Sequence, residues 1–260
     1  SETPDVTFYG QSSARDFATQ NVDTLSTGGN VHEIVMQRGV TVSGYVRDKG
    51  EGLGGVEVGM VPADRSSHTF TGDHSVGTFD NGYFEIPNLP AQTEFNVYGI
   101  MQSLQGIGTI PTRNITTGPN GERFQMGDLD VEPGLSIKGR VKLSDGRSIP
   151  PDTRLSISRQ DAWDSLFCIL AEDGSFHADG LPQGEYGLYV RVPGYRLSKK
   201  NYSLDPLNLH GLIGVIHEDV KDITILLEPG DRWNPNTDRI EEGPGQTQLQ
   251  QSPIRGVDPE

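Results

Sequence analysis

Short runs in which apolar and polar residues alternate fill most of the chain, and turn residues separate them. Each such run predicts a β-strand with one buried face. Three segments end alike, at Gly39, Gly134 and Gly230, which are spaced 95 and 96 residues apart. The first two of these glycines are followed by matched strands, "VTVSGYVRD" and "LSIKGRVKL". The spacing therefore predicts a repeat, with one unit in residues 39–133 and a second in residues 134–230.

The apolar positions of both units fall on one side of each predicted strand. The residues expected to point inward are Val40, Val42, Val46, Val56, Val58, Met60, Phe84, Ile86, Phe95 and Val97 in the first unit, and Leu135, Ile137, Val141, Leu155, Ile157, Phe176, Ala178, Tyr186, Leu188 and Val190 in the second. Gly44 and Gly139 share that side, and a strand glycine there predicts a bulge or the close approach of a neighbouring strand.

One phrase recurs in both units: "TFDNGYFEIPNLP" at residues 78–90 and "AEDGSFHADGLP" at residues 171–182. Asn81-Gly82 and Asp173-Gly174 predict two-residue hairpin turns with positive φ angles. Each unit then offers six or seven short strands, and two packed sheets bury one face of each. We therefore expect an all-β protein of tandem antiparallel β-sandwiches, immunoglobulin-like or prealbumin-like, with about seven short strands each.

The two ends of the chain have different patterns. The sequence pattern of residues 1–38 matches that of the end of the second unit. This match predicts that residues 1–38 are the C-terminal strands of a truncated preceding repeat; the alternative is an arm that adds a strand to the first sandwich. Residues 231–260 contain few apolar side chains and no periodicity. They are expected to be a largely disordered tail.

The matched motifs resemble the carboxypeptidase regulatory-like domain, a transthyretin-like or prealbumin-like β-sandwich. In the second unit, residues 181–186 and Gly194-Tyr195 follow the family's Leu-Pro-x-Gly-x-Tyr and Gly-Tyr pattern, whereas the first unit has Gln92-Thr93 where a glycine is usual. The resemblance covers residues 39–230 and implies a non-catalytic accessory module. It further implies a structural spacer or interaction domain of a bacterial secreted, periplasmic or cell-surface protein, joined to neighbouring domains of the same longer chain.

The charge of the chain narrows the range of partners. Its formal net charge is −15 and its pI is about 4.7. Nucleic acid and anionic membrane surfaces should therefore be repelled, and neither is an expected partner. Apolar runs also fall short of the roughly 18 residues that a membrane span needs, so we expect no membrane insertion. The spread of the acidic residues favours a solubilising surface.

We find no arrangement typical of catalysis in the sequence. The single cysteine, Cys168, has apolar neighbours and no nearby histidine, which favours an inert buried thiol. Gly-x-Ser-x-Gly, His-Glu-x-x-His and EF-hand patterns are lacking. The histidine-rich loop at residues 66–80 could hold a metal through His68, Asp73 and His74, but a solvated loop needs no metal and is the favoured interpretation. We therefore expect no enzyme, no cofactor and no catalytic or metal residue.

Exposed aromatic side chains would instead indicate a binding module. Trp163, Tyr189 and Tyr195, together with His68 and His74, are the candidate ligand-binding residues, and a glycan, a peptide or another protein is the candidate partner. Trp163 lies next to "SLFCIL" and can equally belong to a core. A fragment of a larger hydrolase, with its catalytic domain outside this chain, is a second alternative.

Overall fold

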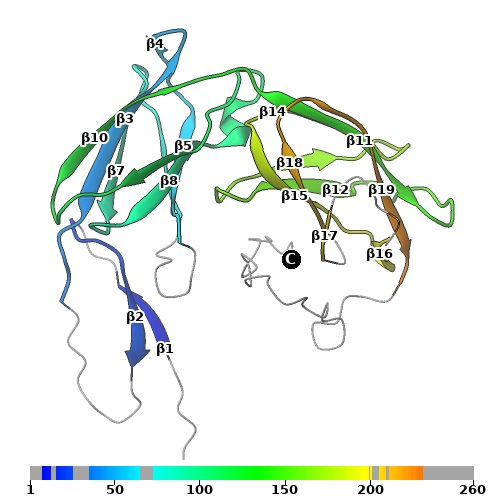
Figure 1. Cartoon of the computed structure of the whole chain (residues 1–260), viewed down its shortest axis with the longest axis horizontal. Helices are drawn as coiled ribbons and strands as arrows, with labels where there is room; N and C mark the ends of the chain where they lie inside the picture. Colours follow the sequence, from blue (N-terminus) through cyan, green and yellow to red (C-terminus); the bar gives the residue numbers. More distant parts are fainter. Residues whose placement is uncertain are drawn as a thin grey trace, which may run out of the picture.

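A computed structural model describes residues 8–12, 16–25, 35–64, 73–198, 200, 205–208 and 211–230. These residues form strands, joined by turns and by one short 3-10 helix, η1 (Met101–Leu104). Figure 1 shows two β-sandwiches side by side, preceded by the hairpin of β1 (Phe8–Ser12) and β2 (Gln20–Leu25). None of the described helical segments is long and apolar enough to cross a membrane.

The first sandwich consists of β3 to β10, in two sheets. One sheet contains β3 (Val40–Asp48), β4 (Glu51–Gly52), β7 (Tyr83–Leu89) and β10 (Arg123–Asp130). The facing sheet has the order β6-β5-β8-β9, with β5 (Glu57–Pro62), β6 (His74–Gly77), β8 (Glu94–Gly99) and β9 (Arg113–Thr116). The first and last strands, β3 and β10, pair in parallel, so the end of the unit returns beside its beginning.

The second sandwich repeats this plan from β11 to β19. One sheet has the order β14-β11-β19-β16, with β11 (Leu135–Leu143), β14 (Ser175–Leu181), β16 (Tyr195–Leu197) and β19 (Val220–Pro229). The other has the order β13-β12-β15-β18-β17, with β12 (Arg154–Arg159), β13 (Ser165–Ile169), β15 (Gly184–Val190), β17 (Asp205–Asn208) and β18 (Gly211–Ile216). Again the first and last strands, β11 and β19, pair in parallel.

The prediction of an all-β fold of tandem sandwiches is confirmed. The residues expected to face inward are buried in two apolar clusters, one in each sandwich, except that Leu135 is only partly buried. The two strand glycines lie where neighbours come close, as expected: a Cβ at Gly44 would lie 2.5 Å from the Gly127 carbonyl oxygen, and one at Gly139 would lie 2.5 Å from that of Ile223. Alternation therefore located the core correctly.

The prediction of two-residue hairpins at Asn81-Gly82 and Asp173-Gly174 is wrong. In the first sandwich, β6 pairs with β5, whereas β7 pairs with β3 in the other sheet. The Asn-Gly turn therefore forms a corner where the chain passes from one sheet to the other. Within these two dipeptides only the glycine has a positive φ angle, +79° at Gly82 and +77° at Gly174. The dipeptide indicated a sharp turn, but the long-range strand pairing decided where its flanking segments went.

What the sequence predicts for the two ends of the chain, residues 1–38 and 231–260, remains a prediction. The structure describes β1 and β2 as an antiparallel pair, and Phe17 pairs with Arg38 through an isolated bridge. That residues 1–38 end a preceding repeat remains a prediction. The tail at residues 231–260 lies outside the described residues.

Candidate functional site: the joint between the sandwiches

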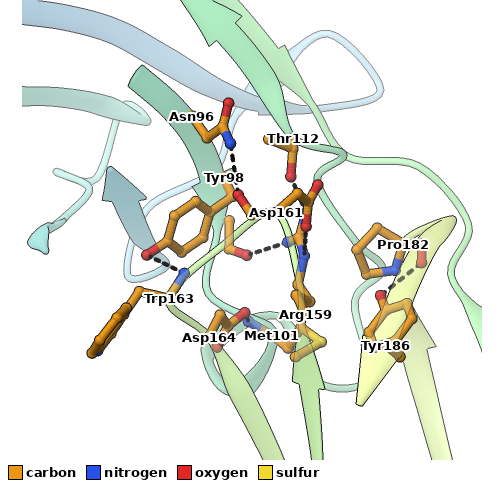
Figure 2. A network of polar contacts seen from close by, with 11 residues as sticks. Asn96, Tyr98, Met101, Thr112, Arg159, Asp161, Trp163, Asp164, Pro182 and Tyr186 are labelled. Atoms are coloured by element: carbon orange, nitrogen blue, oxygen red, sulfur yellow. Dashed lines mark hydrogen bonds and ion pairs between the residues drawn. The ribbon is translucent and has the colours of Figure 1, made fainter. Parts of the chain in front are cut away.

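The most elaborate polar arrangement in the described chain lies where the two sandwiches meet (Figure 2). Alternation along β8 sends Phe95 and Val97 into the core of the first sandwich, so Asn96 and Tyr98 point outward. The loop of residues 160–164, between β12 and β13 of the second sandwich, covers this outer face. Val61, Tyr98 and Ala162 form a small apolar cluster there, and Tyr98 is only 1% exposed.

A glycine makes room for the tyrosine ring. Gly59 pairs with Tyr98 across β5 and β8, and a Cβ at Gly59 would overlap that ring. In the second sandwich the glycine lies on the same strand as the tyrosine, since a Cβ at Gly187 of β15 would clash with the ring of Tyr189. In both units an outward tyrosine therefore lies against the sheet over a glycine, but only Tyr98 is covered by another sandwich.

Three hydrogen bonds connect the covering loop to the first sandwich. The Asn96 side-chain amide donates to the Asp161 carbonyl oxygen at 2.9 Å. The Trp163 backbone N–H donates to the Tyr98 hydroxyl at 3.2 Å, and the Met101 backbone N–H donates to the Asp164 carboxylate at 2.9 Å. These bonds satisfy polar groups that the contact removes from water, which makes the contact depend on orientation.

Arg159 is the charged centre of the joint. Its side chain is 2% exposed, and its guanidinium lies 5.5 Å from the centre of the Tyr98 ring. It donates to the Gly99 carbonyl oxygen at 3.5 Å and to the Thr112 hydroxyl, both in the first sandwich, and it pairs with Asp161 at 3.3 Å. A buried guanidinium needs such partners, because an unpaired charge at this depth would be strongly destabilising.

The neighbouring acidic side chain, Asp164, is also buried. Burial raises the pKa of its carboxyl group, while the Met101 N–H and the Arg159 charge act in the opposite direction. Burial likewise raises the pKa of the Tyr98 hydroxyl. The arrangement is thus a hydrogen-bonded joint between two folding units, in which the Arg159 charge partly offsets the effect of burial on Asp164.

The helix η1 links the two cores. Leu104 packs into the apolar cluster of the first sandwich, whereas Met101 packs into that of the second, and both are buried. The sandwiches therefore share core residues as well as surface contacts.

The candidate ligand-binding residues occupy separate surroundings. Trp163 lies partly buried at the joint, Tyr189 lies half-buried on the outer face of β15, and Tyr195 in β16 donates its hydroxyl to Asp145 at 2.7 Å. His74 packs edge-on against Phe95, with 6.4 Å between ring centres, and its Nε2 lacks a hydrogen-bond partner among the described residues. His68 lies outside the described residues. Their role in binding remains a prediction.

Two other sequence inferences concern reactive groups. Cys168 is half-buried, burial raises the pKa of its thiol, and the thiol donates to the His177 carbonyl oxygen at 3.6 Å. Among the described residues, no three His, Cys, Asp or Glu side chains gather in a way that could hold a metal ion.

The sequence did not single out Arg159 or Asp164, although a signal was present. Leu155 and Ile157 are inward positions of β12, and Arg159 continues the same phase. A charged residue in the apolar phase of a strand, followed closely by two aspartates, indicates a buried ion pair. This local pattern does not indicate which surface of the protein Arg159 would contact.

Comparisons with known proteins show low similarity. No family model and no curated protein matches the chain, so the resemblance to the carboxypeptidase regulatory-like domain is not confirmed. Among solved structures, a streptococcal ancillary pilin has 14% identity and a TM-score of 0.34, over 88% of this chain and 77% of that one. The minor pilin GBS52 of Streptococcus agalactiae has 10% identity and a TM-score of 0.32, over 75% and 98%. The Bacillus anthracis TIE protein has 13% identity and a TM-score of 0.29, over 85% and 39%. Values this low support no conclusion about function.

Proposed function

We propose that this chain is a non-catalytic structural module that holds its neighbours at a fixed spacing and orientation in a bacterial secreted, periplasmic or cell-surface protein. The observation that carries the proposal is the joint around Arg159, where a fully buried guanidinium from one sandwich binds a carbonyl and a hydroxyl of the other. Its partners are the neighbouring domains of the same longer chain.

The physical reason is the difference between this joint and an ordinary linker. Domains joined only by polar surface contacts are expected to move relative to each other. Here Met101 crosses into the core of the second sandwich, and Tyr98 is buried under its loop. Reorienting the sandwiches would expose these apolar side chains and break the hydrogen bonds from Met101 to Asp164 and from Arg159 to Gly99, which is unfavourable. A rigid pair of sandwiches is what a spacer requires.

Two sequence features also support this role. The repeat itself resembles accessory domains that occur in tandem, and the spacing of 95 and 96 residues leaves no long linker between the units. The net charge of −15 favours solubility and disfavours contact with anionic surfaces.

Nuclear magnetic resonance relaxation of backbone ¹⁵N in the intact chain tests the proposal. We expect the two sandwiches to tumble with one common correlation time. Ala162→Asp places an unpaired charge at a position that is 2% exposed and should release the joint, giving shorter, separate correlation times. Ala171→Asp, at an exposed position of the second sandwich, is the matched control and should change nothing. Independent tumbling of the unaltered sandwiches would rule out the spacer role.

A further inference from the structure

A row of aromatic side chains lies at one end of the first sandwich. Phe79, in the turn between β6 and β7, stacks on Tyr83 with 6.1 Å between ring centres and an interplanar angle of 22°. Tyr83 in turn contacts Tyr45 of β3, with 5.4 Å between centres. Phe79 is 64% exposed, which is unusual for so large an apolar side chain.

The second sandwich shows that the fold does not require these rings. The same turn occurs there: the Phe79 N–H donates to the Tyr83 carbonyl oxygen at 2.8 Å, and the Ala171 N–H donates to that of Ser175 at 2.9 Å. Asn81 and Asp173 each accept a hydrogen bond of 3.0 Å from the residue two positions on. Yet the positions of Phe79, Tyr83 and Tyr45 are taken by Ala171, Ser175 and Arg140. A turn of the same geometry therefore forms without aromatic residues.

One end of the row already holds a cation. The Arg47 guanidinium lies 5.1 Å from the centre of the Tyr45 ring, and its charge is paired with Asp128 at 2.7 Å. At the other end, Tyr83 stacks on one side of the Phe79 ring, and the exposed part of Phe79 is open to solvent. Aromatic faces attract guanidinium and ammonium groups. The exposed ring of Phe79 thus offers an aromatic face to a cation, as the ring of Tyr45 does to Arg47.

Acidic residues lie near the open end. Asp80 and Asn81 line a shallow hollow together with Thr78, Phe79 and Tyr83. The β3–β4 hairpin, which carries Glu51, packs against this turn, since a Cβ at Gly52 would overlap the Asn81 carbonyl oxygen. Among the described residues, Asp80 and Glu51 form no ion pair. An aromatic face beside unpaired carboxylates is complementary to a positive charge.

We propose that Phe79, Tyr83 and Asp80 form a binding site for the guanidinium side chain of a basic peptide segment. The guanidinium stacks on the open face of Phe79 and pairs with the Asp80 carboxylate, which extends the row that Arg47 closes at its other end. A guanidinium is favoured over a neutral saccharide, because the Asp80 carboxylate beside the ring can pair with a positive charge. The strongly acidic chain would also attract a basic segment at long range.

The test is a titration of the intact ¹⁵N-labelled chain with two capped peptides, one containing two arginines between glycines and one with citrulline in their place. Citrulline keeps the planar shape of arginine but is neutral. We expect the arginine peptide to shift the amide signals of residues 78–83, with little effect from the citrulline peptide. Phe79→Ala should weaken binding about two- to fivefold.

Matched variants separate the site from general attraction. Phe79→Ala and Tyr83→Ser install the residues that the second sandwich carries at these positions, so both should fold. Asp80→Asn should weaken binding and reduce its salt dependence. Phe167→Ala removes another exposed ring, 52% exposed on β13, and should leave binding unchanged. Equal binding of the citrulline peptide would overturn the proposal, as would shifts spread over the acidic surface and insensitive to Phe79→Ala. Shifts at residues 78–83 caused by a neutral oligosaccharide instead of the arginine peptide would overturn it too.

Discussion

Replacing Arg159 by alanine should uncouple the two sandwiches without destroying either. The guanidinium is bound on one side to Gly99 and Thr112 of the first sandwich and on the other to Asp161 of the second. Its removal leaves the buried Asp164 with the Met101 N–H but without a neighbouring positive charge. Leaving buried polar groups without their hydrogen-bond partners typically costs about 1 to 3 kcal/mol, and more where one of the groups is charged. Because the hydrogen-bond partners of Arg159 lie in both sandwiches, we expect this loss of free energy to weaken the contact between the sandwiches.

Urea unfolding followed by tryptophan fluorescence measures this effect. The chain has two tryptophans, and Trp233→Phe leaves Trp163, at the joint, as the only one. In this background, Arg159→Ala should move the Trp163 transition to lower urea. The transition should also separate from the loss of β-sheet circular dichroism, since the joint then opens before the sandwiches unfold.

Arg154→Ala is the matched control, because Arg154 lies on the same strand but is exposed. Surface substitutions of this kind usually change stability by less than about 0.5 kcal/mol. If Arg159→Ala lost no more free energy of unfolding than Arg154→Ala, the view that a buried guanidinium holds the sandwiches together would be refuted.

Three further substitutions test the fold and its pH dependence. Gly174→Val forces a β-branched residue to a φ of +77° and against the Val141 carbonyl oxygen, so thermal unfolding should show a loss on the order of 1 to 3 kcal/mol or more; an unchanged midpoint would contradict the turn geometry. Leu188→Ala, at a position 3% exposed, should cost about 2 to 5 kcal/mol in urea unfolding, and a loss below about 1 kcal/mol would mean that the site is not tightly packed. Burial lowers the pKa of His74 from its usual 6.5, against the opposing effect of Asp73. The unfolded chain therefore binds a proton at a pH where the folded chain does not, and stability should fall as the pH drops below about 6.5. His74→Leu, which installs the residue type that Leu166 provides at the matching position of the second sandwich, should remove that part of the pH dependence; an identical pH profile would show that His74 is not the cause.

Local patterns predicted the strands and their buried faces well. Phe84 and Ile86 on one strand and Leu188 on another are buried where alternation placed them. Gly44 lies at a close backbone approach, as a glycine in an apolar phase indicates. These features depend on neighbours along the chain and on the period of a strand, so sequence alone carries the information. The pairing of β7 with β3 instead of β6 depends on distant segments, and the turn at Asn81-Gly82 did not reveal it.

The joint was harder to predict, because it is formed between surfaces. Tyr98 occupies an outward position of its strand, and the same is true of the half-buried Tyr189 in the second unit. Sequence gives these two tyrosines equal status, yet only the first is covered by another sandwich. Met101 follows β8 and packs into the core of the neighbouring unit. Such crossings become visible only when the two sandwiches are placed in space.

A distance measurement between spin labels tests the rigidity of the pair most directly. Cys168→Val removes the native thiol, and Gln125→Cys with Glu172→Cys places one label on an exposed position of each sandwich. Pulsed electron paramagnetic resonance should then give one narrow distance distribution that salt and moderate temperature changes leave in place. Two labels placed within a single sandwich serve as the control and should give a narrow distance distribution. If that control is narrow, a broad or multimodal distribution between the two sandwiches would contradict the rigid joint on which the proposed spacer function depends.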